Sequence, residues 1–211
     1  MLHCTDHGTA LTEPAGTHLF GLFGLFGRLT ALLGAIACSA PGSARATEQP
    51  APSPTPSLYV EAGISDHRSP TTRARTVGLR IPLQYSFWQG RIRTDLDMYL
   101  SDWSSTAAPP VRRHTTQLGV VPMFRYRFAD GRSPWFVEGG IGLSYLTATY
   151  HTPNNYFGSR WNFSDHLGVG LSFGAQQQHE IALHAKHVSN AGLRKPNPGE
   201  TFVQIRYAHR F

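Results

Sequence analysis

The feature that most constrains the fold of this chain is an alternation of apolar and polar residues with a period of two. It recurs along nearly the whole sequence after residue 57. Side chains at positions i and i+2 of a β-strand lie on the same face, so the alternation predicts strands with one apolar face. Eight such strands are predicted, and their apolar faces run over residues 58–64, 77–85, 92–100, 118–128, 135–145, 163–173, 181–189 and 203–211.

The opposite faces of these strands carry charged residues and glycine, for example Arg80, Asp97, Arg125, Glu138 and His184. A barrel with these faces inside and bulky apolar residues outside is the inverse of a water-soluble barrel and is typical of the outer membrane. Alternation alone also allows a soluble, lipocalin-like barrel that buries the apolar face. Strand length, glycine-rich polar faces and the terminal Phe211 favour an all-β, eight-stranded antiparallel transmembrane β-barrel of the bacterial outer membrane.

Connection lengths predict which way the strands run. The connections at 88–90, 129–133 and 174–177 are short, whereas those after the first, third, fifth and seventh strands are longer. Outer-membrane barrels have short periplasmic turns and long external loops. The seventh strand therefore ascends, and His187 and Ser189 at its end reach the outer rim.

The first 46 residues read as a secretory signal peptide. Arg28 precedes an apolar run from Leu29 to Ala40, and Ala44-Arg45-Ala46 is a small-residue cleavage signal. A lipoprotein signal ending at Cys38 is a weaker alternative, because Ala35 stands where that signal usually has leucine. Residues 47–57 form a proline-rich lead-in, and residues 58–211 form the barrel.

Charge and cysteine content narrow the chemistry. The formal net charge is +6, which suits nucleic acid or an anionic lipid surface. No run of lysines is present, so lipid is favoured and nucleic acid is not expected as a partner. Cys4 and Cys38 both lie in the leader, which favours serine over cysteine chemistry. The histidines show no zinc-type spacing, so neither a metal nor another cofactor is expected.

Several other residues can be interpreted as structural parts of the barrel. His184 and Lys186 point into the barrel beside Glu180 and are expected to form an internal charge network. Asp165 interrupts the apolar face of the sixth strand, which a local bulge or a functional role would explain equally well. The tryptophans lie near strand ends, as expected for aromatic girdles, at positions 88, 103, 135 and 161.

His187 and Ser189 lie two residues apart on the apolar face of the seventh strand. A histidine can remove the proton of a serine hydroxyl and make it a nucleophile. The small-residue stretch Asn190-Ala191-Gly192 follows and can supply donors to an oxyanion. Taken alone, the pair is more simply interfacial polarity, and both Asn190-Ala191-Gly192 and Asn197-Pro198-Gly199 are ordinary turn sequences.

The whole segment from His187 to Glu200, leading to Tyr207 and Phe211, resembles the C-terminal signature of the lipid A 3-O-deacylase family, the PagL-type outer-membrane esterases. The resemblance is specific over about the last 25 residues. It implies an eight-stranded barrel that hydrolyses the ester-linked acyl chain at position 3 of lipid A, with lipopolysaccharide as its partner. It also implies His187 as general base, Ser189 as nucleophile, and Asn190 with Gly192 as oxyanion contributors.

The acidic member of the implied serine–histidine–glutamate triad has two candidates. Glu200 is the only carboxylate between His187 and the C-terminus, so it is the expected orienter of His187. The family's spacing places the glutamate one position later, at Thr201, and strict alternation back from Val203 also puts Thr201 on the apolar face. A non-enzymatic barrel, acting as a structural protein, adhesin or narrow pore, is the alternative function. The sequence leaves open whether the protein forms a homodimer.

Overall fold

The computed structural model describes residues 55–66, 71–105, 114–152 and 155–211. The predicted signal peptide and most of the proline-rich lead-in lie outside the described residues.

Eight antiparallel strands close into one barrel, as the alternation predicts, in the order β1, β10, β9, β8, β5, β4, β3, β2. A short hairpin of β6 and β7 lies within the connection between β5 and β8. The elements are β1 (Ser57–Ser65), β2 (Thr72–Phe87), β3 (Ile92–Ser105), β4 (His114–Arg127), the 3-10 turn η1 (Ala129–Gly131), β5 (Trp135–Leu146), β6 (His151–Thr152), β7 (Asn155–Tyr156), β8 (Trp161–Phe173), β9 (His179–Ser189) and β10 (Glu200–Arg210).

The apolar face of the strands is on the outside, which confirms the predicted orientation. Val60, Ile141 and Ile205 are 56%, 66% and 60% exposed, whereas Arg80 and Glu138 are each 3% exposed and face the lumen. An apolar outer wall around a charged interior is the arrangement of a barrel that contacts lipid. Within the described part of the chain, no helix is long and apolar enough to cross a membrane.

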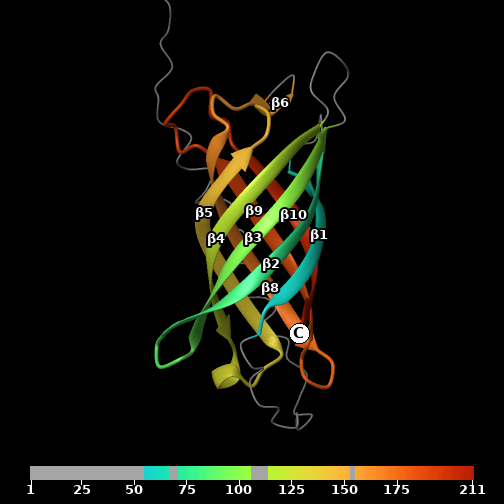
Figure 1. Ribbon diagram of the computed structural model, residues 1–211, viewed down its shortest axis with the longest axis vertical. Coiled ribbons are helices and arrows are strands. Elements are labelled where there is room, and N and C mark those ends of the chain that lie inside the picture. The colour runs from blue at the N-terminus through green and yellow to red at the C-terminus, as the bar shows by residue number, and fades with distance from the viewer. Residues whose placement is uncertain (1–54, 67–70, 106–113, 153–154) are drawn as a thin grey trace, which may run out of the picture. The chain divides into compact units, whose positions relative to one another are not determined.

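The two ends of the barrel differ in their connections, as predicted (Figure 1). Tight connections and the C-terminus lie at one end, here called the inner end, where η1 is part of the β4–β5 connection. The longer connection between β5 and β8 lies at the opposite, outer end and includes β6. β2 departs from regular pairing toward the inner end, where the register with β3 shifts between Pro82 and Ser86. The extra residues of β2 at this bulge bend the strand and increase its local twist at the inner mouth of the lumen.

The outer part of the lumen is filled by an apolar cluster, here called the outer plug, made of Ala74, Trp103, Leu146, Tyr150, Phe157, Val188 and Phe202. The prediction of Trp103 as a girdle residue is wrong, because its side chain is 2% exposed and packs inside the barrel. Trp103 stands on the inward phase of β3 with Ser101 and Ser105, so the alternation itself carried this information. Trp88, Trp135 and Trp161 are exposed as expected.

Candidate active site

His187 and Ser189 end β9 at the outer end of the barrel, on the outward face of the strand. Both side chains are half-buried, while Val188 between them is buried in the outer plug. The alternation that places Val188 inward therefore places His187 and Ser189 together on the lipid-facing wall. Ser189 lies opposite Phe163 of β8 in the register, so the hydroxyl is next to an apolar surface.

The imidazole of His187 is held by Thr201 and not by Glu200. Thr201 of β10 is the register partner of His187, and its Oγ1 lies 2.9 Å from His187 Nδ1. Glu200 stands one residue earlier, on the opposite phase of the strand, and is 1% exposed inside the lumen. The expectation that the Glu200 carboxylate contacts His187 is not met. The phase of β10 is already regular at its first residue, despite the preceding Pro198-Gly199.

Glu200 belongs instead to a buried polar group within the outer plug. The hydroxyl of Tyr150 donates a 2.8 Å hydrogen bond to Glu200 Oε2 and lies 2.6 Å from Thr72 Oγ1. Burial and the nearby Glu200 carboxylate both raise the pKa of Tyr150, so its phenol stays protonated and remains a donor. This group ties β2 and β10 to the β5–β8 connection directly behind the candidate site.

A row of polar residues crosses the outward wall at the level of His187. Asp165 of β8 is the register partner of His187 on one side, and Thr201 is its partner on the other. Asp66, just after β1, continues the row, because its backbone N–H donates a 2.9 Å hydrogen bond to the Thr201 carbonyl. Pairing of β8 with β9 is continuous through Asp165, so no bulge explains this residue. The interruption that Asp165 makes in the apolar pattern was the sequence signal for its place beside His187.

The residues predicted as oxyanion contributors form the loop after β9. Asn190 is 2% exposed, its Oδ1 accepts hydrogen bonds from the backbone N–H groups of Gly192 and Arg194, and its Nδ2 donates to the Arg194 carbonyl. The backbone N–H of Asn190 donates to Asn197 Oδ1 at 2.8 Å. Asn190 and Gly192 follow closely after Ser189 in the chain. In this structure, however, their N–H donors form hydrogen bonds to oxygens within the loop.

Gly199 allows the loop backbone to approach His187 and Ser189 closely. A Cβ at this position would lie 2.6 Å from His187 Cε1, 3.0 Å from His187 Nε2 and 3.7 Å from Ser189 Cβ. Its φ of +74° also lies in the left-handed region that favours glycine. The loop backbone at Gly199 therefore packs directly against the Nε2 edge of the imidazole, next to Ser189, and a side chain at this position would displace His187.

His184 and Lys186 face the lumen and form an internal charge network as predicted, but their partners are Glu61 and Glu138, whereas Glu180 pairs with Arg125. His184 lies 2.8 Å from Glu61 and 2.9 Å from Glu138, and Lys186 contacts Glu61. Each of these side chains is buried among counter-charges rather than facing an open site. In the ranges that the structure describes, no group of three or more histidine, cysteine, aspartate or glutamate residues is arranged to hold a metal ion.

Comparison with known proteins connects this site to a family. The model of the family described as lipid A 3-O-deacylase (PagL) matches residues 74–210. The chain is 30% identical to the lipid A deacylase PagL of Bordetella bronchiseptica over 149 residues, covering 71% of this chain and 80% of that protein. It is 34% identical to the lipid A deacylase PagL of Pseudomonas aeruginosa over 134 residues, covering 62% and 74%.

A solved structure agrees with the family match. The crystal structure of the outer membrane enzyme PagL superimposes with a TM-score of 0.61 and 27% identity, covering 74% of this chain and 99% of that one. The matched residues include both strands that carry His187, Ser189 and Thr201. The chain therefore belongs to the lipid A 3-O-deacylase (PagL) family of outer-membrane enzymes.

Proposed function

We propose that this chain is an outer-membrane serine esterase that hydrolyses the ester-linked acyl chain at position 3 of lipid A, with Ser189 as nucleophile and His187 as base. The observation that carries the proposal is the shared outward face of these two side chains at the outer end of β9, where the loop backbone at Gly199 packs against the imidazole. The ester bonds of a lipid in the outer leaflet lie near the headgroups, at the depth of this end of the barrel.

The reaction follows from the contacts of His187. When Nδ1 carries the ring proton and donates to Thr201 Oγ1, Nε2 is left as the basic nitrogen. Ser189 Oγ attacks the ester carbonyl and its proton passes to Nε2. The tetrahedral intermediate then collapses, and His187 returns the proton to the departing sugar hydroxyl. Water attacks the acyl-serine, again with His187 as base, and releases the fatty acid and the free serine.

We further propose that Asp165 supplies the negative charge that stabilises the His187 imidazolium, in place of a triad glutamate. Directly opposed residues of an antiparallel pair have Cβ atoms about 4.5–5.5 Å apart. Asp165 and His187 are such a pair and share the outward face. Glu200 faces the lumen, so its carboxylate supports the site from behind through Tyr150. Thr201 fixes the orientation of the ring.

The apolar surface beside Ser189 suits the acyl chain of the substrate. Phe163 lies opposite Ser189, and Leu143 lies opposite Phe163 on the next strand with 55% of its surface exposed. An acyl chain laid across these residues would bring its ester carbonyl to Ser189. We propose that the donors of the oxyanion hole come from the loop at Asn190 and Gly192, whose internal hydrogen bonds would then exchange when the substrate binds.

The test is mass spectrometry of lipid A from cells that make the wild-type chain or the Ser189→Ala variant in equal folded amounts. The wild type should yield lipid A lighter by one 3-O-linked acyl chain, and the variant should leave lipid A intact. A structural barrel, adhesin or pore has no use for the serine and would leave lipid A unchanged in both strains. Equal deacylation by both proteins would exclude Ser189 as the nucleophile.

A further inference from the structure

Two histidines face each other across the last two strands at the inner end of the barrel. His179 is the first residue of β9, and its register partner on β10 is His209, close to the C-terminus (Figure 1). Both side chains are half-buried and lie on the outward phase of their strands, which Tyr207 shares. Strand pairing therefore holds the two imidazoles opposite each other, with Cβ atoms at the separation of about 4.5–5.5 Å that direct partners have.

Three polar atoms of these side chains converge. Nδ1 of His179 lies 3.4 Å from Nδ1 of His209 and 2.9 Å from the hydroxyl oxygen of Tyr207. A separation of 3.4 Å exceeds the range of about 2.7–3.2 Å for good hydrogen bonds from N–H groups, so a proton between the two rings holds them together only weakly. Both nitrogens can turn their lone pairs to one ion when each ring carries its proton on Nε2.

The separation of these nitrogens matches that of two histidine ligands on one tetrahedral metal ion. Zinc binds imidazole nitrogen at about 2.0–2.1 Å, and two such bonds at the tetrahedral angle place the nitrogens about 3.3–3.4 Å apart. A square-planar ion at the same bond length would bring neighbouring nitrogens to about 2.9 Å. The observed 3.4 Å therefore favours zinc among the ions that imidazole binds well.

Aromatic side chains hold both imidazoles in place. Phe173 of β8 stacks on His179 with ring centroids 5.3 Å apart and an interplanar angle of 28°. Tyr207 stacks on the same histidine at 6.1 Å, and Phe211 packs edge-on against His209 at 5.7 Å. Rings that are already ordered lose less side-chain freedom when they bind a ligand. The pair is therefore preorganised to act as a metal-binding site.

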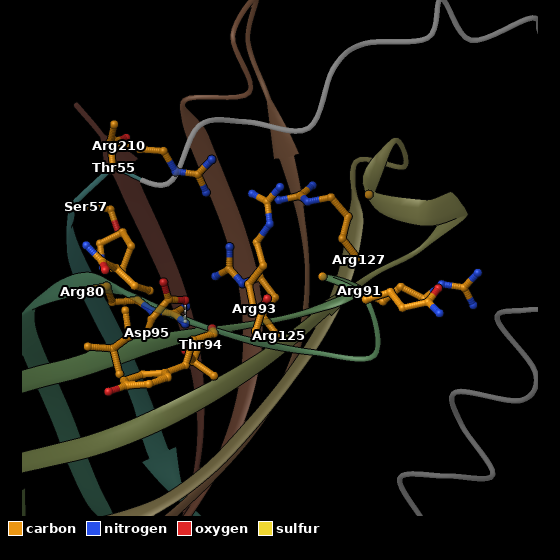
Figure 2. Close-up of a pocket in the computed structure, with 18 of the residues that line it drawn as sticks. Thr55, Ser57, Arg80, Arg91, Arg93, Thr94, Asp95, Arg125, Arg127 and Arg210 are labelled. Carbon is orange, nitrogen blue, oxygen red and sulfur yellow. Dashed lines mark hydrogen bonds and ion pairs between the residues drawn. The ribbon is translucent and has the colours of Figure 1, made fainter.

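The positive charge next in sequence is directed away from the histidine pair. Arg210 follows His209 and points into the lumen, where it contacts Glu180 and lines a cavity of about 550 Å³ at the inner end (Figure 2). The two histidines are 30 residues apart, so their spacing in the sequence gave no sign of a zinc site. The donor set joins two histidines to a tyrosine, and so differs from the groups of three or more histidine, cysteine, aspartate or glutamate residues that the described chain lacks.

We propose that His179 and His209 form a binding site for Zn²⁺ at the periplasmic rim of the barrel, with both Nδ1 atoms as ligands. Water completes the tetrahedral shell, and the Tyr207 hydroxyl is within reach of a metal-bound water. Such a site exchanges its metal, since closed structural zinc sites have four protein ligands. Bound zinc links β9 to β10 and stabilises the folded barrel. The site is separate from lipid A hydrolysis, because His187 and Ser189 lie at the other end of β9.

The test is isothermal titration of the folded, untagged barrel with Zn²⁺, in a zwitterionic detergent at neutral pH. The wild type should show saturable binding that Mg²⁺ does not compete with, because Mg²⁺ prefers oxygen ligands. His179→Asn and His209→Asn should each weaken the affinity by at least about tenfold, since even indirect partners of metal ligands contribute about 10- to 100-fold. Tyr207→Phe should have a smaller effect. Co²⁺ bound in place of zinc should give the visible absorption of a four-coordinate ion.

Matched controls separate this site from the other histidines. His114→Asn removes an exposed histidine at the start of β4 and should leave zinc binding unchanged. Ser189→Ala should also bind zinc normally, so failure of the esterase proposal would not affect this one. Heat-modifiable migration checks folding, and either single variant, His179→Asn or His209→Asn, suffices if the other does not fold. Absence of saturable binding, unchanged affinity in a folded variant of the pair, or a six-coordinate Co²⁺ spectrum would each overturn the proposal.

Discussion

The two ends of the barrel lumen are built from opposite kinds of residue. Behind His187 and Ser189 the lumen is closed by the outer plug, where the buried polar group of Thr72, Tyr150 and Glu200 is enclosed by aromatic side chains. At the inner end the lumen opens into a cavity of about 550 Å³ lined by several arginines, next to the bulge in β2. His187 and Ser189, which we propose as the reactive pair, need a rigid support, because a displacement of about 1 Å can cost a factor of about 10² in rate. We expect the outer plug behind them to provide that support.

The largest difference between the ends should appear when histidines at the two ends of β9 are compared. His187→Ala should reduce turnover of lipid A by a factor of at least about 10⁴, because nucleophile and base act as one unit. His179→Ala, at the inner end of the same strand, should leave turnover unchanged, since His179 contacts Tyr207 and not the site. Initial rates in mixed micelles measure both. Similar losses in the two variants would show that the effect is on the barrel and not on the chemistry.

The next effect concerns the carboxylate that serves His187. Asp165→Asn should lower kcat by a factor on the order of 10² to 10⁴, as loss of a triad carboxylate does. It should also change the pH profile of kcat, because the imidazolium loses its counter-charge. Glu200→Gln keeps the size and the hydrogen bond of the side chain and should have a smaller effect, with the pH profile unchanged. The reverse ranking would mean that Glu200 reaches the site during catalysis and that Asp165 is a bystander.

Thr201 provides a further comparison on the same row. Thr201→Val keeps the shape of the side chain but removes the hydroxyl that meets His187 Nδ1. We expect a loss in kcat of about tenfold, in line with one hydrogen bond of about 1.5 kcal/mol. Thr201→Ser should restore most of the rate. If Thr201→Val were fully active, the ring would have to be held by another group.

The smallest effect should be on stability alone. Tyr150→Phe removes the donor to Glu200 inside the outer plug, and the free energy of unfolding should fall by about 1–3 kcal/mol because a buried carboxylate loses a hydrogen bond. Heat-modifiable gel migration and denaturant titration report this change. Phe124→Leu on the exposed outer wall is a matched control and should alter stability less. A larger loss in the control would contradict the view that the outer plug is the rigid part of the barrel.

Much of this fold was readable from the alternation, because one face of every strand meets lipid and the other meets the lumen. The same phase rule places Thr201 outward and Glu200 inward, and the structure follows it from the first residue of β10. The placement of Asp165 opposite His187 depends instead on the register of β8 with β9. The turn between β8 and β9 contains Gly174 and Gln177 with positive φ. The sequence alone does not show which residues of β8 and β9 pair across this turn.

The cavity at the inner end of the lumen could not be predicted from the sequence either, for a different reason. Alternation identifies Arg80, Arg125 and Arg127 of the cavity wall as inward-facing. It does not indicate the shift of register between Pro82 and Ser86 in the same wall. Nor does it indicate that one carboxylate, Glu180, is shared by three guanidinium groups. These features depend on which side chains from distant strands reach the same level of the lumen.

The central claim is that His187 activates Ser189 on the lipid-facing wall, and covalent labelling tests it most directly. The folded barrel in detergent is treated with a long-chain alkyl fluorophosphonate, and the modified residue is located by peptide mass spectrometry. We predict a single phosphonylated residue, Ser189, with labelling lost in His187→Ala and retained in His179→Ala. Labelling of a different serine, or labelling of Ser189 at the same rate without His187, would contradict the account.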